Sequence, residues 1–202
     1  MKYKLIPLAF LLLRSFGCNE HLFTDYRPLE QSGMWSSSVQ ELKKLNTSDT
    51  EVEQLAKMKQ AGISDDTCVA VIADARNHQH PFASADSAMG LMHAGYNESI
   101  ILEMTKVDQL DKLNGDAVML RLVGLSDAAV DTILRKRMKG QRTLSSGEIG
   151  RLKNTGLTES QIMERINRGM TDAEADKEAA VREATRNHAN TGFQRVRGRR
   201  HY

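Results

Sequence analysis

Asp74, His78 and His80 are the side chains whose types and spacing come nearest to a metal site. They lie in the segment DARNHQHPF, where Asp74 and His78 are four residues apart and would share one face of a helix. A metal ion would need further ligands, and the sequence has no second cluster of His or Cys. Because Pro81 follows, we interpret the segment as a helix end, and we expect neither a metal nor another cofactor.

Nucleophilic and phosphate-transfer chemistry have no motif in the sequence. There is no Gly-x-Ser-x-Gly elbow, no Walker-type loop and no dinucleotide fingerprint. Serines and acids gather instead at the expected starts of helices, where they cap the helix and favour its dipole. Cys68 falls on an apolar helix face, so we expect a buried and unreactive thiol. The sequence therefore predicts a binding or scaffolding protein without catalytic residues.

The C-terminal stretch TGFQRVRGRRHY carries a candidate anion-binding site. It consists of Arg195, Arg197, Arg199 and Arg200, with no acid between them. Guanidinium groups at this density suit polyanions such as lipid headgroups, lipopolysaccharide, acidic glycans or nucleic acid. The alternative is a solvated tail that keeps the protein soluble or folds against an acidic patch of the body.

The elements that would position these residues are helices in a repeated hairpin. The segments AGISDD, AGYNES, VGLSDA and TGLTES share a glycine, an apolar residue, a small polar residue and an acid. The glycines and the polar residues are Gly62 and Ser64, Gly95 and Asn97, Gly124 and Ser126, and Gly156 and Thr158. The glycine is expected to end one helix in a left-handed turn, and the polar residue to cap the next helix. We interpret the motif as a structural joint and not as a catalytic loop.

The spacing of the joints indicates the fold class. Successive joint glycines are 33, 29 and 32 residues apart, which fits two short helices per unit. Aromatic residues make up only 5% of the chain, and three prolines are present, so the composition favours helix over sheet. We expect an all-α array of about eight or nine short helices in helix-turn-helix repeats of about 31 residues, either solenoid-like or a compact bundle.

The glycine–apolar–Ser/Thr–acid turn resembles the turns of short helical modules such as the ubiquitin-associated domain and the bacterial short C-terminal (SHOCT) domain. The likeness consists of turn chemistry in each copy. It therefore implies a helical hairpin and carries over no binding residue.

The N-terminal stretch MKYKLIPLAFLLLRSFGCNE has the layout of an export signal. Lys2 and Lys4 are followed by an apolar run over residues 5–13, which is too short to span a bilayer as a helix. After Arg14, residues 15–18, SFGC, resemble the lipobox of bacterial lipoproteins, whose signal peptidase cuts before a lipid-modified cysteine. The resemblance implies that Cys18 is lipidated, and Asn19 after it implies delivery to the outer membrane. A secretory signal cut nearby and an uncleaved membrane anchor are the alternatives.

These observations divide the chain into four expected segments. Residues 1–17 are the signal peptide, and residues 18–36 are the lipidated cysteine and a tether. Residues 37–182 form the helical-repeat domain, and residues 183–202 form the end of the C-terminal helix and the basic tail. Trp35 is expected as a packing anchor just before the first helix.

The expected function is that of a non-enzymatic envelope lipoprotein. The lipid on Cys18 would hold it to the outer membrane, facing the periplasm, and the arginine tail would contact a protein or an anionic envelope partner. The alternative is a soluble helical module whose tail binds nucleic acid. An enzyme without a sequence motif is a third class, which a deep polar pocket with perturbed carboxylates would indicate.

Overall fold

Helices make up the regular secondary structure of the computed structural model, which describes residues 24–197. Over this range there are eleven α-helices and no strand, so the predicted all-α class is confirmed, with more helices than the eight or nine expected. The helices are α1 (Arg27–Gln31), α2 (Ser36–Lys44), α3 (Asp49–Gln60), α4 (Asp65–Asn77), α5 (Ala85–His93), α6 (Glu98–Lys106), α7 (Leu110–Leu122), α8 (Asp127–Met138), α9 (Ser146–Asn154), α10 (Glu159–Asn167) and α11 (Asp172–Arg197).

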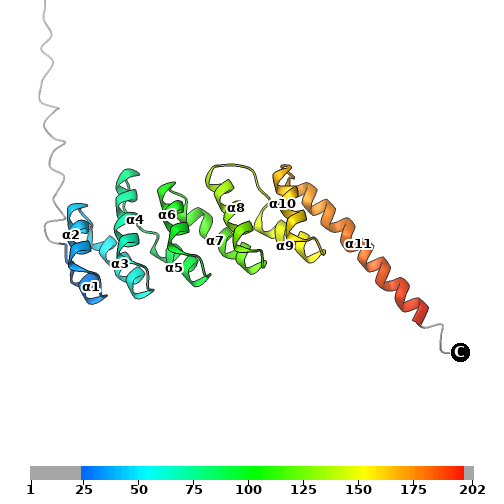
Figure 1. Cartoon of the computed structure of the whole chain (residues 1–202), viewed down its shortest axis with the longest axis horizontal. Helices are drawn as coiled ribbons and strands as arrows, with labels where there is room; N and C mark the ends of the chain where they lie inside the picture. Colours follow the sequence, from blue (N-terminus) through cyan, green and yellow to red (C-terminus); the bar gives the residue numbers. More distant parts are fainter. Residues whose placement is uncertain (1–23, 198–202) are drawn as a thin grey trace, which may run out of the picture.

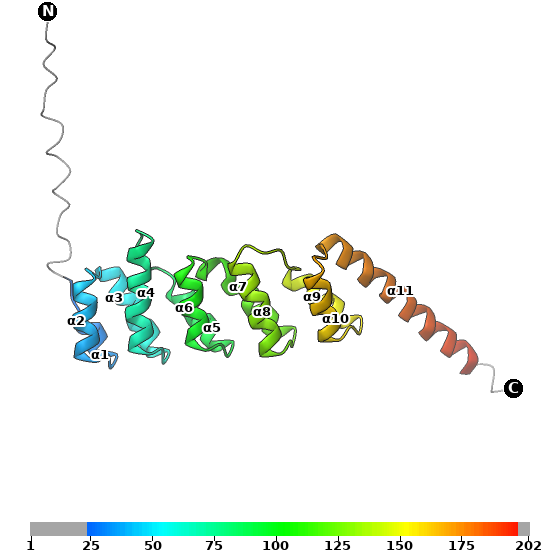
Figure 2. The ribbon, with the colours of Figure 1, turned by 45° about the horizontal axis from the view of Figure 1, so that its top comes forward.

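Consecutive helices form hairpins that stand side by side in sequence order (Figure 1). The first helices of the hairpins pack on one another in one layer, which runs α1, α3, α5, α7, α9 and ends on α11. The second helices form the other layer, in which α2 packs on α4 and α4 packs on α6. Figure 2 shows the same row from another side, with α11 leaving the end of the array. Each hairpin thus buries its apolar face against its neighbours, as in helical-repeat proteins.

The array begins at Arg27 and not at residue 37, because a further joint precedes those that the sequence motif identifies. Gly33 has a φ of +85°, and Met34 after it is buried, with 5% of its surface exposed. Helix α1 ends at this joint and packs on α3. Trp35 is 77% exposed, so the expectation of a packing anchor is wrong. Part of the segment expected as a tether therefore forms the first hairpin.

The joints of the motif have the backbone that the glycines permit. Their φ values are +85° at Gly62, +82° at Gly95, +76° at Gly124 and +94° at Gly156. The side chains of Ser64, Asn97, Ser126 and Thr158 each accept the backbone N–H three residues further on, at the start of the next helix. Each joint therefore ends one helix and caps the next within a few residues.

The backbone of each joint also closes the core beneath it. At the second joint the Gly62 N–H donates to the Lys59 carbonyl at 2.9 Å, and the Ile63 N–H donates to the Met58 carbonyl at 3.1 Å. This pair of bonds is a Schellman motif, which satisfies the last carbonyls of a helix. Ile63 and Met58 are both fully buried. The equivalent buried pairs are Leu29 and Met34, Leu91 and Tyr96, Leu120 and Leu125, and Leu152 and Leu157.

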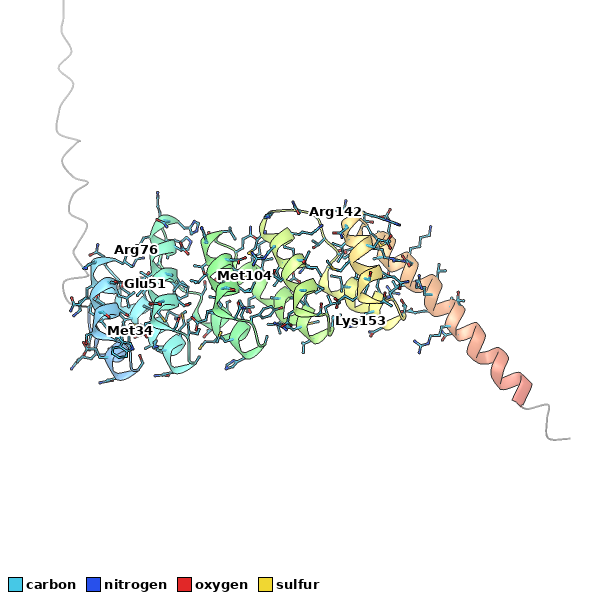
Figure 3. All side chains as sticks on the ribbon, in the orientation of Figure 1. Met34, Glu51, Arg76, Met104, Arg142 and Lys153 are labelled. Atoms are coloured by element: carbon cyan, nitrogen blue, oxygen red, sulfur yellow. The ribbon has the colours of Figure 1, made fainter. Side chains whose placement is uncertain are left out.

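A buried ion pair joins the two helices of the second hairpin. Glu51 of α3 is 1% exposed, and its carboxylate accepts both terminal nitrogens of Arg76 in α4, at 2.8 and 2.6 Å. Figure 3 shows the two residues next to each other near the start of the array. Arg76 also donates from Nε to the Leu45 carbonyl at 2.9 Å, in the loop that ends the first hairpin. The guanidinium group therefore links three segments of the chain.

Candidate functional site: a groove at the third joint

Neighbouring hairpins are connected by hydrogen bonds from the N-cap of one helix to an acid of the next hairpin. Glu98, the first residue of α6, accepts the backbone N–H of Ser64 at 3.0 Å and also its hydroxyl. Glu159, the first residue of α10, accepts the same two donors of Ser126, at 2.7 and 2.5 Å. We call this connection the backward clasp, because the later hairpin supplies the acid and the earlier one the N-cap.

The clasp glutamates are held in their charged form. Burial raises the pKa of Glu98, but hydrogen bonds from the hydroxyls of Ser64 and Thr67 and from the Ser64 N–H lower it by more. The pKa of Glu98 therefore lies below its ordinary value. The hydroxyl and the N–H of Ser126 lower the pKa of Glu159 in the same way. Hydrogen bonds to a charged acceptor are stronger than neutral ones. The clasps therefore contribute to the cohesion of the array at neutral pH.

An aspartate makes the clasp at the first joint. Asp65 of α4 accepts the backbone N–H of Trp35 at 2.8 Å, while Lys59 Nζ lies 2.5 Å from its other oxygen. The shorter acid can thus reach the preceding hairpin and hold a cation of its own hairpin at once. The length of an aspartate does not by itself prevent the clasp.

The third joint lacks the clasp. Asp127 of α8 stands at the clasp position, but it pairs with Arg121 of its own hairpin. The donor that it would meet, the backbone N–H of Asn97, has no hydrogen-bond partner within the described part of the chain. Closely packed pairs in the second layer stop at α6 among the described helices. The clasp of Glu159 still bridges the fourth joint, whereas the third joint is left open.

A groove of about 420 Å³ occupies the open joint. Its polar lining comes from the start of α6, the end of α7 and one side of α8 and consists of Asn97, Ser99, Arg121, Asp127, Asp131 and Arg135. Tyr96 and Ile100, both only 5% exposed, add apolar surface. This combination of charged, amide and apolar groups is suited to a polar side chain or a short peptide segment.

Arg121 is the central cation of the groove. Its guanidinium carbon lies 4.5 Å from the centroid of the Tyr96 ring, and Nη2 donates to the Gly95 carbonyl at 3.3 Å. The Tyr96 hydroxyl donates to the Ala117 carbonyl at 2.7 Å, and burial raises the pKa of Tyr96 to about 12, so the ring stays neutral beneath the cation. Arg121 Nε is buried and has no partner among the described residues. The guanidinium is therefore fixed in place with one donor unused.

Arg135 forms the second cationic part of the lining. It pairs with Asp131 of its own helix at 2.8 Å and with Glu103 of α6 at 2.5 Å. The second of these ion pairs crosses from α8 to α6 and borders the groove. Arg135 is thus already paired with two acids, whereas the only acid paired with Arg121 in the described chain is Asp127, whose side chain is 80% exposed.

The histidine segment connects two hairpins. His78 Nε2 lies 3.1 Å from the Lys106 carbonyl, His80 Nε2 lies 2.9 Å from the Asp108 carboxylate, and the two rings stack with centroids 5.9 Å apart. Over residues 24–197 no group of three or more His, Cys, Asp and Glu side chains could hold a metal ion, and Asp74 does not join the histidines in one. The segment is the end of α4 and its loop, as the position of Pro81 predicts.

The expected attachment sites fall at the ends of the chain. Cys18 lies outside the described residues, and so do Arg199 and Arg200. Arg195 and Arg197 belong to α11, of which only the backbone is described at that point. No described helix combines the length and the apolar character needed to cross a membrane.

Cys68 belongs to the core of α4. It is fully buried, and burial raises the pKa of its thiol to about 12, so the thiol stays protonated at neutral pH. The prediction of a buried cysteine is confirmed. Such a thiol is a poor nucleophile.

The sequence motif did not point to the groove, although a signal was present. Arg121 lies three residues before the glycine of the fourth joint, where the second and fifth joints have Lys59 and Lys153. Asn97 is the only asparagine among the small polar residues of the four motif copies. Both residues line the groove, and they differ from the residues at the same positions of the other motif copies.

No protein-family model, no curated protein and no solved structure matches this chain.

Proposed function

We propose that the protein is a non-enzymatic lipoprotein of the bacterial cell envelope that acts as a binding or scaffolding module. The lipid on Cys18 anchors it, the helical hairpins present a long surface, and the basic tail contacts an anionic partner. The observation that carries the binding role is the groove at the third joint, which lies between the clasped second and fourth joints. A groove built from polar and apolar groups between repeats is a common form of ligand site.

The most strongly shifted carboxylates support binding over catalysis. Burial raises the pKa of Glu51, but Arg76 and the N–H groups of Ser48 and Phe82 lower it to about 2. The hydrogen bond from Arg165 lowers the pKa of Glu178 to about 2, although burial alone would raise it. Glu178 is therefore likewise held in an ion pair. Perturbed groups of this kind mark catalytic sites when they line a cleft. Here both are paired with arginines that connect helices, and neither lines the groove. Glu51 lines a separate open pocket of about 420 Å³, but its carboxylate is occupied there by Arg76 and the Phe82 N–H.

The anchor is tested by expressing the full chain and a Cys18→Ser variant in a bacterial host. Intact mass and detergent partitioning are measured for both. We expect the parent chain to lose residues 1–17, to carry an acyl mass on Cys18 and to enter the detergent phase, and the variant to stay in the aqueous phase.

A different outcome would replace the proposal. A soluble chain of unprocessed mass, unaffected by Cys18→Ser, contradicts the lipoprotein role. If that chain also binds nucleic acid with an affinity that falls steeply with salt, the arginine tail is a nucleic-acid contact.

A further inference from the structure

We infer that the groove at the third joint binds a carboxylate presented by a partner polypeptide, in the place that an acid of the chain occupies at the first, second and fourth joints. The inference rests on the binding role proposed above but not on the lipid anchor. The partner group is a glutamate side chain, whose carboxylate accepts the Asn97 N–H and a donor of Arg121.

The repeats themselves provide the template for this ligand. At the second and fourth joints a glutamate carboxylate accepts the N-cap N–H of the preceding hairpin, at 3.0 Å for Ser64 and 2.7 Å for Ser126. At the third joint the equivalent N–H, that of Asn97, has no acceptor in the described part of the chain. The same arrangement of the N-cap N–H thus binds a carboxylate at two other joints of this molecule. At the third joint the groove lies where that carboxylate would be.

Arg121 supplies a second, independent reason to expect an anion. Its Nε is buried without a partner among the described residues, and its guanidinium is held by Tyr96 and the Gly95 carbonyl. Its one carboxylate partner among the described residues, Asp127, has an 80% exposed side chain. Exposed ion pairs contribute little to stability, so an incoming carboxylate can displace Asp127 into solvent.

The charges around the groove determine how selective it is. Asp127 and Asp131 balance Arg121 and Arg135, and Glu103 adds one acid at the border. A free anion therefore gains little from long-range attraction, and binding depends on the short hydrogen bonds to Asn97 and Arg121. A groove of about 420 Å³ also exceeds the volume of one carboxylate, so the rest of the side chain contacts Tyr96 and Ile100.

The probe is a peptide that copies the chain's own clasp. A blocked peptide with the sequence GLTESQI, residues 156–162, carries the glutamate that closes the fourth joint. The matched control has glutamine in place of that glutamate. Both are titrated into the ¹⁵N-labelled full chain in mild detergent, and the amide resonances are followed by NMR.

We expect the glutamate peptide to shift the Asn97 amide resonance saturably and to bind at least fivefold more tightly than the glutamine peptide. The clasped amides of Ser64 and Ser126 serve as internal controls and should not move. Equal affinity of the two peptides, or shifts that leave Asn97 unmoved, would overturn the inference.

Two variants separate the carboxylate site from a nonspecific peptide contact. Arg121→Gln removes the cation and should weaken binding of the glutamate peptide at least fivefold, towards the affinity of the glutamine peptide. Asp66→Glu, at an exposed position of α4 away from the groove, should leave the affinity unchanged. If Arg121→Gln binds the peptide as tightly as the parent chain, the site is not the groove. Because peptide binding is measured on purified protein, its failure leaves the result of the partitioning experiment intact.

Discussion

Glu98 of α6 accepts both the backbone N–H and the hydroxyl of Ser64 in the preceding hairpin. We expect Glu98→Ala to lower the free energy of unfolding by about 1–3 kcal/mol, because it leaves the Ser64 N–H without its charged acceptor. The matched control is Asp127→Ala at the open joint, where only an exposed ion pair is lost and the cost should stay below about 1 kcal/mol. Urea denaturation of both variants checks the difference. Equal costs would mean that the clasp does not stabilise the array.

The ion pair of Glu51 and Arg76 should be the most sensitive polar contact of the first two hairpins. We expect Arg76→Met to destabilise the protein by about 3–5 kcal/mol, because it leaves the Glu51 carboxylate buried without its cation. Arg27→Met is the control, since the side chain of Arg27 is 79% exposed and pairs only locally with Asp25. Thermal and urea unfolding measure both. A loss below about 1 kcal/mol for Arg76→Met would contradict the importance of the pair.

The same pair predicts a pH dependence. The pKa of Glu51 falls from 4.5 to about 2 on folding, so its charge stabilises the native state fully above the unfolded pKa. This contribution is lost as the pH falls from about 4.5 towards about 2 and amounts to roughly 3 kcal/mol. Glu51→Gln removes it. We therefore expect the stability difference between the parent chain and Glu51→Gln to shrink over that pH range, and a difference independent of pH would contradict the assigned pKa.

A pair of glycines tests the joints. Gly156 has a φ of +94°, and a Cβ there would meet no atom within 4 Å, so the cost of Gly156→Ala comes from the backbone alone. We expect a loss of about 1–2 kcal/mol. Gly115 lies inside α7 with equally open surroundings, and Gly115→Ala should instead stabilise the protein by up to about 1 kcal/mol. Thermal unfolding of the two variants should therefore shift in opposite directions.

Trp35 is the N-cap residue of α2, and its side chain cannot accept an N–H from the first turn of that helix. Its backbone is extended, at φ −66° and ψ 142°, like the caps of the other joints, but no side-chain cap bond forms. We expect Trp35→Ser to raise the free energy of unfolding by about 0.5–1 kcal/mol, since serine can accept an N–H of the first turn of α2. Differential scanning calorimetry of the purified chain would show this as a higher melting temperature. A lower one would reveal that the exposed indole covers apolar surface.

Local sequence chemistry was sufficient to predict the repeated joints. Glycine, a small polar residue and an acid each have a role within a few residues of their own position, as at Gly62, Ser64 and Asp65. The sequence motif did not identify the first joint, because Trp35 and Ser36 stand there in place of the polar cap and the acid. Its helix α1 is also only five residues long, too short for an apolar period to be recognised.

The groove could not be predicted, because it depends on a choice between two partners. Asp127 has the same position in the motif as Asp65, and both have a cation three residues before the joint glycine. Asp65 reaches the N-cap of the preceding hairpin, and Asp127 does not. That difference arises from the packing of α8 relative to α6, which pairs residues far apart in the sequence.

The backward clasps all run in the same direction, and this gives the array unequal ends. At the first, second and fourth joints a hairpin's N-cap is completed by the hairpin made after it, so on the ribosome these three hairpins wait for their successors before this N–H is satisfied. A chain cut short from the C-terminus exposes an N–H that has lost its carboxylate, whereas a chain trimmed from the N-terminus exposes only a carboxylate that water can solvate. The array therefore matures from its first hairpin towards its last and is more vulnerable to shortening at its C-terminal end.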